Sequence, residues 1–418
     1  MLALALAIAA QAAEPIELSD GASLQLEAGA RVVYAAVQNP GFGDAPSDPN
    51  GAGQLRVFGR SKLSVGEHLE VVLQLNSATQ AGAQPGPRPL DVDLLHLQQG
   101  FVTVRDGPVA LTVGRQEWKL GNGLLVSDRE GPNIKRAFDG GRLVIDTGGV
   151  RVENLIGAEV EVHPGIFDDV PSTNSLFWAS WWEVDSPVKT TEHTMYYLGT
   201  AQTEAVYASG SGQETRHTVG TGWSRQPAPP DRDPIVDFHF DVHGQVGQFS
   251  ERRILAWGAV GHVGVPTGLP MRLTATLDAG RSSGDSAATP LGTFRAPYPD
   301  PRVLGAVTQI APGNTSGVVP GLNAFPHPRV RVAAKATFLW RTNVNDSIYS
   351  IAGFPIRPSD TDARYIGAGA GGSVAWFAVP KKLSVVAFGD WFKPGGVLTG
   401  AGPAKSPWLL ACAIRLNL

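Results

Sequence analysis

The chain of 418 residues contains 50 Gly and 32 Pro but one Cys, and its formal net charge is -4 at pH 7. This mild negative charge excludes a generally basic surface of the kind that binds nucleic acid, and the single cysteine excludes an internal disulfide. The length would suit about two or three soluble domains. Glycine and proline, however, punctuate short alternating segments along the whole chain, which is typical of an all-β protein.

The chain begins with an apolar segment, residues 2–10, and then the small-x-small site Ala10-Gln11-Ala12. This pattern is typical of a secretory signal peptide, although a short apolar helix is the alternative. We predict a signal peptide over residues 1–12 and one mature domain over residues 13–418. The mature chain reaches its first alternating strand within about 15 residues, which leaves no room for an N-terminal plug domain.

The first clear strand signal is residues 54–65, where Arg56 and Arg60 fall on one face and Leu55 and Val57 on the other. This alternation with a period of two residues predicts a strand with a cationic face. The next run, residues 69–77, alternates in the same way after a short link that suits a hairpin.

The same alternation recurs later, in residues 234–250, 269–279, 328–341 and 408–418. In each run one face is apolar and the other carries polar or charged side chains. Such a polar face would be costly in the core of a soluble protein but is natural in a water-filled lumen. No segment after the signal peptide offers 18 consecutive apolar residues, so a helical membrane protein is disfavoured.

Aromatic and loop-forming residues support a membrane barrel. We expect the former near strand ends, as in the girdles of outer-membrane barrels, with ordinary core aromatics as the alternative; they are Trp178, Trp181, Trp182, Tyr196, Tyr197, Trp376 and Trp391. Gly- and Pro-rich segments at residues 40–53, 80–89 and 283–328 are expected loops. The alternating runs predict an all-β fold, a transmembrane antiparallel β-barrel of the outer membrane with about 18 strands and long extracellular loops.

Charge is concentrated in residues 114–142. The cations there are Arg115, Lys119, Arg129, Lys135, Arg136 and Arg142, and the interleaved acids are Glu117, Asp128, Glu130 and Asp139. A solvated loop would explain such a segment. Since transmembrane strand patterns surround it, we interpret it instead as polar lining of a pore.

Several ordered motifs resemble the bacterial alginate export family of outer-membrane barrels. The segment 114–117 (GRQE), then Gly121, then residues 132–142 (PNIKRAFDGGR) follow the family signature. Residues 91–99, 165–169, 196–199, 216–220 and 283–285 fall in family order, as does Trp340-Arg341 followed by Asp346 and Tyr349. The resemblance covers roughly residues 24–418. At Gly369, Gly371 and Ser373 the chain lacks the acids that family members usually carry, which leaves the identity of the polymer open.

The resemblance implies a channel that passes alginate or a related polyuronate across the outer membrane of a Gram-negative cell. Arginines suit such a wall because they stay charged and meet carboxylates through two hydrogen bonds, and acids including Glu117, Asp139, Asp168 and Asp169 would hold them. The expected pore-lining residues are Arg56, Arg60, Arg115, Glu117, Arg129, Arg136, Asp139, Arg142, Arg272, Arg329 and Arg331. The group Arg115, Arg129, Arg136 and Arg142 is the expected constriction.

The expected partners are an anionic polysaccharide or oligouronate, outer-membrane lipid, an inner-membrane synthase and a periplasmic export scaffold, with no cofactor or metal. One alternative is a selective porin for uptake of small acidic sugars or other anions. Another is that the arginines form a salt-bridged ladder that braces the barrel and selects nothing. His239 and His243 with Asp237 and Asp241 could bind a metal loosely. An enzyme or an adhesin is a further alternative, although no GxSxG element is present.

Overall fold

The computed structural model describes residues 15–19, 21–186, 190–228, 233–286, 290–300, 304, 307–357 and 361–418. The expected signal peptide, residues 1–12, lies outside this described part of the chain.

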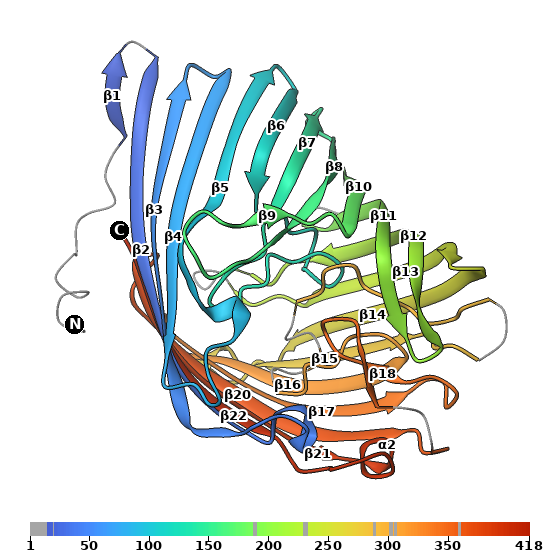
Figure 1. The fold of residues 1–418 in the computed structure, drawn as a ribbon. Coiled ribbons are helices and arrows are strands. Elements are labelled where there is room, and N and C mark those ends of the chain that lie inside the picture. The colour runs from blue at the N-terminus through green and yellow to red at the C-terminus, as the bar shows by residue number, and fades with distance from the viewer. Residues whose placement is uncertain are drawn as a thin grey trace.

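One antiparallel sheet closes on itself to form a barrel. Neighbouring strands pair in chain order, and the last strand of the wall, β22 (Trp408–Asn417), pairs with the first, β2 (Ala22–Gln38). In Figure 1 the red C-terminal strands therefore lie beside the blue N-terminal ones. Over the described residues the wall has eighteen strands, which confirms the predicted antiparallel barrel of about 18. Closure leaves no edge of the wall unpaired, as a bilayer requires.

Between these two strands the wall continues through β3 (Asp48–Val65), β4 (Leu69–Ala81), β5 (Asp93–Asp106), β6 (Val109–Gln116), β7 (Phe138–Asp146), β8 (Val150–Glu161), β10 (Ser175–Asp185), β11 (Glu192–Tyr207), β12 (Gly210–Arg225), β13 (Asp237–Phe249), β14 (Arg252–Pro266), β15 (Thr274–Ser282), β16 (Thr315–His327), β17 (Val330–Arg341), β20 (Tyr365–Val379) and β21 (Leu383–Pro394). The short strands are β1 (Ile16–Ser19), β9 (Val170–Pro171), β18 (Ile348–Tyr349) and β19 (Pro355–Arg357). Single turns of helix occur at η1 (Pro40–Gly43), η2 (Pro89–Asp91), η3 (Pro270–Arg272) and α2 (Gly396–Thr399). None of the described helices has the length and apolar character needed to span a membrane.

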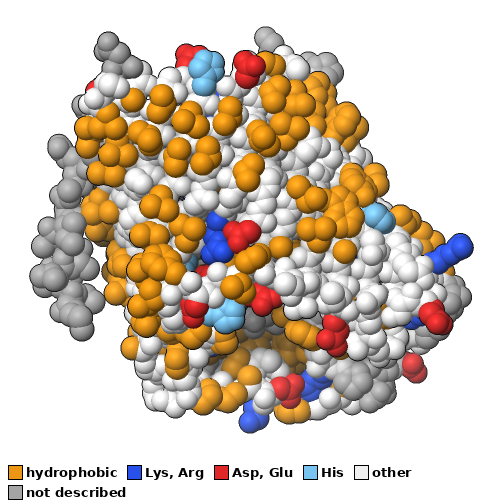
Figure 2. Space-filling model, turned by 45° about the horizontal axis from the view of Figure 1, so that its top comes forward, with side chains coloured by type: hydrophobic (Ala, Val, Ile, Leu, Met, Phe, Trp, Pro, Cys, Tyr) orange, Lys and Arg blue, Asp and Glu red, His pale blue; other side chains and the backbone are white. Residues whose placement is uncertain are grey.

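Side chains along each wall strand point alternately outward and into the lumen. In β3, Leu55 and Val57 are 39% and 41% exposed, whereas Arg56 between them is 8% exposed. In β22, Leu410 is exposed and Ala411 is buried. A pleated strand places consecutive side chains on opposite faces, so the alternation in the sequence becomes an apolar exterior and a polar interior. Figure 2 shows hydrophobic side chains spread over the outer face.

Five of the six expected strand runs coincide with wall strands or extend one to three residues beyond them, namely at β3, β4, β13, β17 and β22. The run 269–279 is only half right, because β15 begins at Thr274 and the chain turns before it through η3. Met271 and Arg272 have φ of 63° and 51° there, values that a strand does not allow.

The expected loop 283–328 also needs correction, because its last part, Thr315–His327, is strand β16. Pro320 and Pro326 hid this strand, since proline cannot donate a ladder hydrogen bond. The register with β17 skips from Val318↔Phe338 to Gly321↔Lys335, which leaves Pro320 out of that ladder.

Two of the aromatic residues expected on the exterior lie inside the barrel. Trp182, Trp376 and Trp391 are 44%, 51% and 45% exposed, as outward residues should be. Trp181 and Tyr196 are buried, and their rings stack with centroids 4.8 Å apart. Trp181 and Trp182 are consecutive residues of one strand, so one side chain points into the lumen and the other points outward.

The connections between strands differ at the two ends of the barrel. One end carries short turns such as residues 66–68 and 380–382, and the other carries the long connections 117–137, 283–314 and 342–364. The last two connections are tied together, because the Asn314 side chain donates to the backbone oxygens of Asp346 and Ser347 at 3.1 and 3.0 Å. The connection 117–137 runs into the lumen, where it packs against part of the connection 283–314: Ser127 N–H donates to the Tyr298 carbonyl at 2.8 Å.

Candidate functional site: a loop that crosses the lumen

The loop 117–137 leaves β6, enters the barrel and returns at β7. Its first part is apolar and packs on the inner face of the wall from β7 to β14. Trp118 is 2% exposed, and its ring stacks on Phe138 with centroids 4.6 Å apart and planes inclined by 11°. The buried cluster around it comprises Leu120, Leu124, Leu125, Val126, Leu155, Phe177, Ala179, Trp181, Tyr196, Leu198, Ala256, Phe294, Ala296 and Tyr298. Burial of this much apolar surface holds this part of the loop firmly.

The second part of the loop reaches the opposite wall, at β3 and β4, through Asn133. This residue is fully buried, and its side-chain nitrogen lies 3.0, 3.1 and 3.1 Å from the backbone oxygens of Leu55, Thr79 and Asp91. An amide has two hydrogens, so one of them is shared. The Asn133 backbone N–H also donates to Asp91 Oδ1 at 2.8 Å. The loop is therefore anchored at both sides of the lumen.

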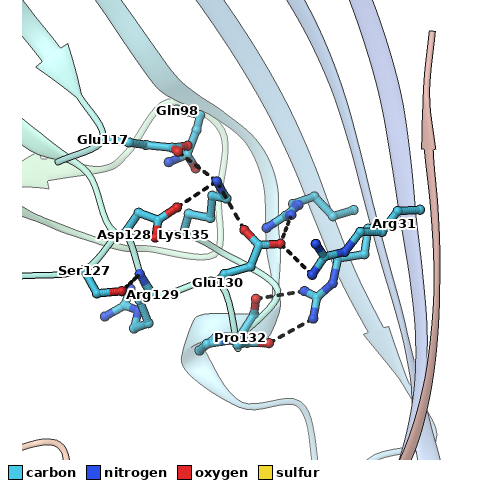
Figure 3. A network of polar contacts seen from close by, with 12 residues as sticks. Arg31, Gln98, Glu117, Ser127, Asp128, Arg129, Glu130, Pro132 and Lys135 are labelled. Carbon is cyan, nitrogen blue, oxygen red and sulfur yellow. Dashed lines mark hydrogen bonds and ion pairs between the residues drawn. The ribbon is translucent and has the colours of Figure 1, made fainter. Parts of the chain in front are cut away.

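Beside this anchor, three arginines stand in one row across the wall. Arg31 of β2 lies directly opposite Arg56 of β3 on one side and Arg415 of β22 on the other. Like charges in directly opposite positions destabilise a sheet unless another group offsets them. Glu130 of the loop does so, with its Oε1 3.3 Å from Arg56 Nη2 and 3.1 Å from Arg415 Nη2. Figure 3 shows the loop carboxylate pointing at this row.

Arg31 interacts with the loop through backbone rather than carboxylate groups. Its Nη1 and Nη2 donate to the carbonyl oxygens of Pro132 and Gly131 at 2.9 and 3.0 Å (Figure 3). Arg56 adds a bond to the Asn133 carbonyl at 3.2 Å. The tip of the loop is thus bound to the arginine row by both backbone and charge.

Lys135 is the centre of the acidic groups in the loop. Its Nζ lies 2.9 Å from Glu117, 3.0 Å from Asp128 and 3.2 Å from Glu130. Burial raises the pKa of Glu117. Burial would also raise the pKa of Glu130, but Lys135 and the two wall arginines outweigh it and lower that pKa to about 2. Glu130 therefore stays ionised throughout the neutral range.

Arg129 and Arg136 meet on one carboxylate of the wall. Glu159 Oε1 lies 2.8 Å from Arg136 Nε and 3.4 Å from Arg129 Nη1. Burial, with the neighbouring Arg136 charge, lowers the pKa of Arg129 to about 10. The Arg136 guanidinium also lies 4.9 Å from the centre of the Tyr298 ring, a cation–π distance. These two cations are close together, as expected, and share one carboxylate.

The prediction for Arg115 and Asp139 as pore-lining residues needs correction. They form a bidentate ion pair at 2.7 and 2.8 Å. In β6, however, Arg115 lies on the same face as Leu111 and Val113, which are 48% and 57% exposed. The register pairs Arg115 with Asp139, so both side chains lie on the outer face of the sheet. The expected four-arginine constriction therefore does not form as one group.

Two other predicted arginines lie on the inner face with acidic partners. Arg142 Nη2 is 2.8 Å from Glu153 Oε2, and Arg60 Nη1 is 3.6 Å from Glu27 Oε2. Among the residues expected to hold arginines, Asp168 and Asp169 instead accept backbone hydrogen bonds from Gly165 and His163 in the β8–β10 loop.

The last three predicted arginines lie near the end with short turns, far along the strands from the loop. Arg272 belongs to turn η3, with its guanidinium 5.9 Å from the centre of the Phe325 ring. Arg329 lies in the β16–β17 turn and donates to the Ala378 carbonyl at 3.1 Å. Arg331 is the second residue of β17 and donates to the Asn323 side chain at 3.2 Å. The first two stand at the rim rather than on a wall strand.

The histidines and aspartates of β13 face the lumen, as their alternation predicts. His243 Nδ1 is 2.8 Å from Asp241 Oδ1, and Asp237 Oδ2 is 2.9 Å from His262 Nε2. These are separate imidazole–carboxylate pairs. Over the described residues no group of three or more His, Cys, Asp or Glu residues is placed to hold a metal ion.

Sequence reasoning did not include Arg31, Arg415, Glu130 and Lys135 among the site residues. Arg415, Glu130 and Lys135 stood in segments that it had noted. A closed barrel makes the first and last strands neighbours, but the sequence does not show the register that places Arg31 opposite Arg415. Barrel closure supplies that contact. A search for cations on the inner face of both terminal strands would have found the row.

Comparison with curated proteins finds no match. Solved structures do resemble the chain. OccK11 (OpdR) of Pseudomonas aeruginosa has a TM-score of 0.62 at 13% identity, covering 94% of this chain and 96% of that one. OccK2 (OpdF) of the same organism, in complex with glucuronate, has a TM-score of 0.61 at 10% identity, covering 94% and 98%. A BenF-like porin of Pseudomonas fluorescens Pf-5 has a TM-score of 0.63 at 11% identity, covering 94% and 98%. At these identities the likeness is one of fold.

The sequence match is to the alginate export family and extends over residues 21–409, nearly the whole chain. The family and the fold are those of outer-membrane transport channels, not of enzymes. The chain therefore belongs to the alginate export family, and its eighteen-stranded barrel is an outer-membrane channel.

Proposed function

We propose that the channel passes carbohydrates that carry carboxylates, with alginate or a related polyuronate as the first candidate. The observation that carries this proposal is the row of Arg56, Arg31 and Arg415, which shares the single carboxylate of Glu130. Arg60, Arg129, Arg136 and Arg142 would extend the cationic surface along the path, with Arg331 near the opposite end. Uronate carboxyls titrate near pH 4, so each sugar is charged at neutral pH.

The ion pairs in the lumen suit transport better than tight binding. Arg56, Arg60 and Arg142 of the inner wall and Arg129 and Arg136 of the loop each have a carboxylate neighbour, for example Glu153 beside Arg142 and Glu159 beside Arg136. A channel needs sites that attract the permeant group but release it again. Paired arginines meet this need, because a passing carboxylate must compete with a resident one. The same pairs also brace the wall, so bracing and conduction are compatible roles.

A second candidate is uptake of small acidic sugars or other small anions. The observation in its favour is the loop 117–137, which crosses the lumen with an apolar cluster on one side and the Asn133 anchor on the other. A lumen partly filled in this way suits a small permeant. The structurally similar OccK2 was solved with glucuronate, a single uronate.

Export and uptake also differ in the partners they require. Export draws polymer from the periplasm, so it would need an inner-membrane synthase and a periplasmic scaffold at the barrel. Uptake needs neither. Co-purification of the native barrel with a polymer-synthesis complex would support export.

Single-channel conductance in a planar bilayer tests the proposal. Oligomannuronate and oligoguluronate of increasing length are titrated against the refolded protein, with neutral oligosaccharides of equal length as controls. The polyuronate candidate predicts an anion-selective current whose block strengthens with the number of charged sugars. The small-anion candidate predicts passage of glucuronate and no gain in block with length. Open channels that are indifferent to charged and neutral sugars would contradict both.

A further inference from the structure

The arginine row has more hydrogen-bonding capacity than its resident carboxylate uses. Glu130 contacts Arg56 and Arg415 through one oxygen, Oε1. Over the described residues Arg31 forms no ion pair with a carboxylate, and the buried Nε atoms of Arg31 and Arg415 have no hydrogen-bond partner. Guanidinium groups favour bidentate carboxylate contacts. The row is therefore built to hold a carboxylate and has donors left for a better one.

The Glu130 side chain can leave the row while the loop backbone stays in place. The neighbouring backbone is held separately, by the four contacts of Asn133 and by Ile134 N–H, which donates to the Leu90 carbonyl at 2.9 Å. None of these bonds involves the Glu130 carboxylate. Its side chain is 19% exposed, so water in the lumen reaches it.

Lys135 can keep the Glu130 carboxylate in an ion pair after that carboxylate has left the arginine row. Glu130 uses Oε2 for Lys135, at 3.2 Å, and Oε1 for the two wall arginines. Rotation of the side chain can thus break the arginine contacts and keep the lysine contact. The charge of Glu130 then remains paired, which avoids the cost of an isolated partly buried ion.

We propose that Glu130 is an internal competitor that occupies the place of a substrate carboxylate on the Arg56–Arg31–Arg415 row, and that each passing uronate exchanges with it. This inference rests on the proposed function, because it names how the same site handles the substrate. Exchange keeps one carboxylate on the row at every step. It also sets the affinity, since each uronate is bound only by the excess of its contacts over those of Glu130.

The test compares two variants of equal charge change, Glu130→Gln and Asp128→Asn. Both remove one loop carboxylate that contacts Lys135, but only Glu130 contacts the wall arginines. We expect Glu130→Gln to lower the half-blocking concentration of an oligouronate by about tenfold, the effect of about 1.4 kcal/mol of lost competition. We expect Asp128→Asn to change it by less than about twofold. The conductance without sugar should stay close to wild type in Asp128→Asn, which leaves the arginine row with its carboxylate.

Two readouts keep this inference distinct from the proposed function. Chloride-over-potassium selectivity, measured without sugar, should rise more in Glu130→Gln than in Asp128→Asn, since only the former leaves the arginine row without its carboxylate. If wild-type channels ignore oligouronates, the proposed function fails and the exchange with uronates fails with it. A selectivity difference between the variants would then show only that Glu130 neutralises part of the charge of the row. Equal selectivity in the two folded variants, or a severalfold rise of the Glu130→Gln conductance that shows loop displacement, overturns the competitor role.

Discussion

The two ends of the loop 117–137 are anchored by opposite kinds of force. Near Trp118 the anchor is apolar, with the indole ring stacked on Phe138 and tilted against Phe177 on the inner wall. Near Glu130 the anchor is polar, with arginines, a lysine and a buried asparagine. Apolar burial is insensitive to salt and pH, whereas ion pairs respond to both. The loop is therefore fixed permanently at one wall and adjustably at the wall that carries the proposed substrate contacts.

The largest effect on attachment of the loop is expected from removal of the apolar anchor. Trp118→Ala should weaken attachment of the loop by about 3 to 5 kcal/mol, the usual cost of deleting a buried aromatic side chain. We expect higher and noisier conductance, and cleavage of the loop by protease added to refolded protein. Trp182→Ala is the matched control, because that ring is 44% exposed on the outer face. A Trp118→Ala channel as quiet as this control would contradict the assignment.

Asn133 is the fixed part of the polar anchor, and its removal should have the next largest effect. Asn133→Ala leaves the carbonyl oxygens of Leu55, Thr79 and Asp91 without their donor, at about 1 to 3 kcal/mol in total for the buried groups. We expect single-channel recordings to show frequent closures and openings that the wild type does not show. Asn122→Ala serves as the control. It removes one hydrogen bond within the same loop, in which the Leu124 N–H donates to Asn122 Oδ1 at 2.9 Å. Equal gating in the two variants would show that Asn133 does not hold the loop.

The sequence predicts the barrel well because the signal is local. Alternation in residues 54–65 needs only the pleat of one strand, and barrel closure follows from the bilayer's demand for paired backbone. The site is harder to predict from the sequence, because it depends on which residues of neighbouring strands lie opposite each other and on whether a side chain faces the lumen or the exterior. Arg115 illustrates the second problem. Its motif lies at the start of a lumen loop, yet the alternation of β6 turns it outward.

The same reasoning explains why charge density alone misplaces the site. Residues 114–142 form the densest charged segment of the sequence. Several of its acids, however, form ion pairs with Lys135 of the same segment. The partners that define the row, Arg31 and Arg415, come from β2 and β22. Contacts between segments this far apart in the sequence cannot be inferred from spacing. The fold class was therefore predictable, whereas the arginine row required the register between β2 and its two neighbours, β3 and β22.

Arg115 and Arg142 provide a smaller test of which arginines face the lumen. Arg115→Ala should lower the free energy of unfolding by about 1 to 2 kcal/mol, because Asp139 loses its partner, with ion selectivity unchanged. Arg142→Ala should instead lower anion selectivity by less than about twofold, since one inner cation is lost near Glu153. Urea unfolding in detergent and reversal potentials measure the two effects. A selectivity loss in Arg115→Ala would place that side chain back in the lumen.

The smallest effect is expected from pH, because two loop carboxyls have opposite shifts. Glu130 has a pKa of about 2 in the attached loop against an ordinary value of 4.5, so its contribution to attachment is complete above 4.5 and is lost as pH falls towards 2. Glu117 has a raised pKa in the attached loop, so attachment gains from it as pH falls through that pKa towards 4.5.

From pH 7 to pH 5 the Glu130 contribution is constant, and only the Glu117 gain operates, so gating noise should stay level or fall slightly. Below pH 4 the loss of the Glu130 contacts dominates and noise should rise. Glu117→Gln should remove any decline in noise that occurs above pH 4.5, and Glu130→Gln should remove the rise at low pH. Noise that climbs steadily from pH 7 downward in the wild type would contradict this assignment of the two carboxyls, because it would require an anchoring group that is protonated near neutrality. The ionic anchor therefore responds to a competing carboxylate at neutral pH, where protons leave it intact.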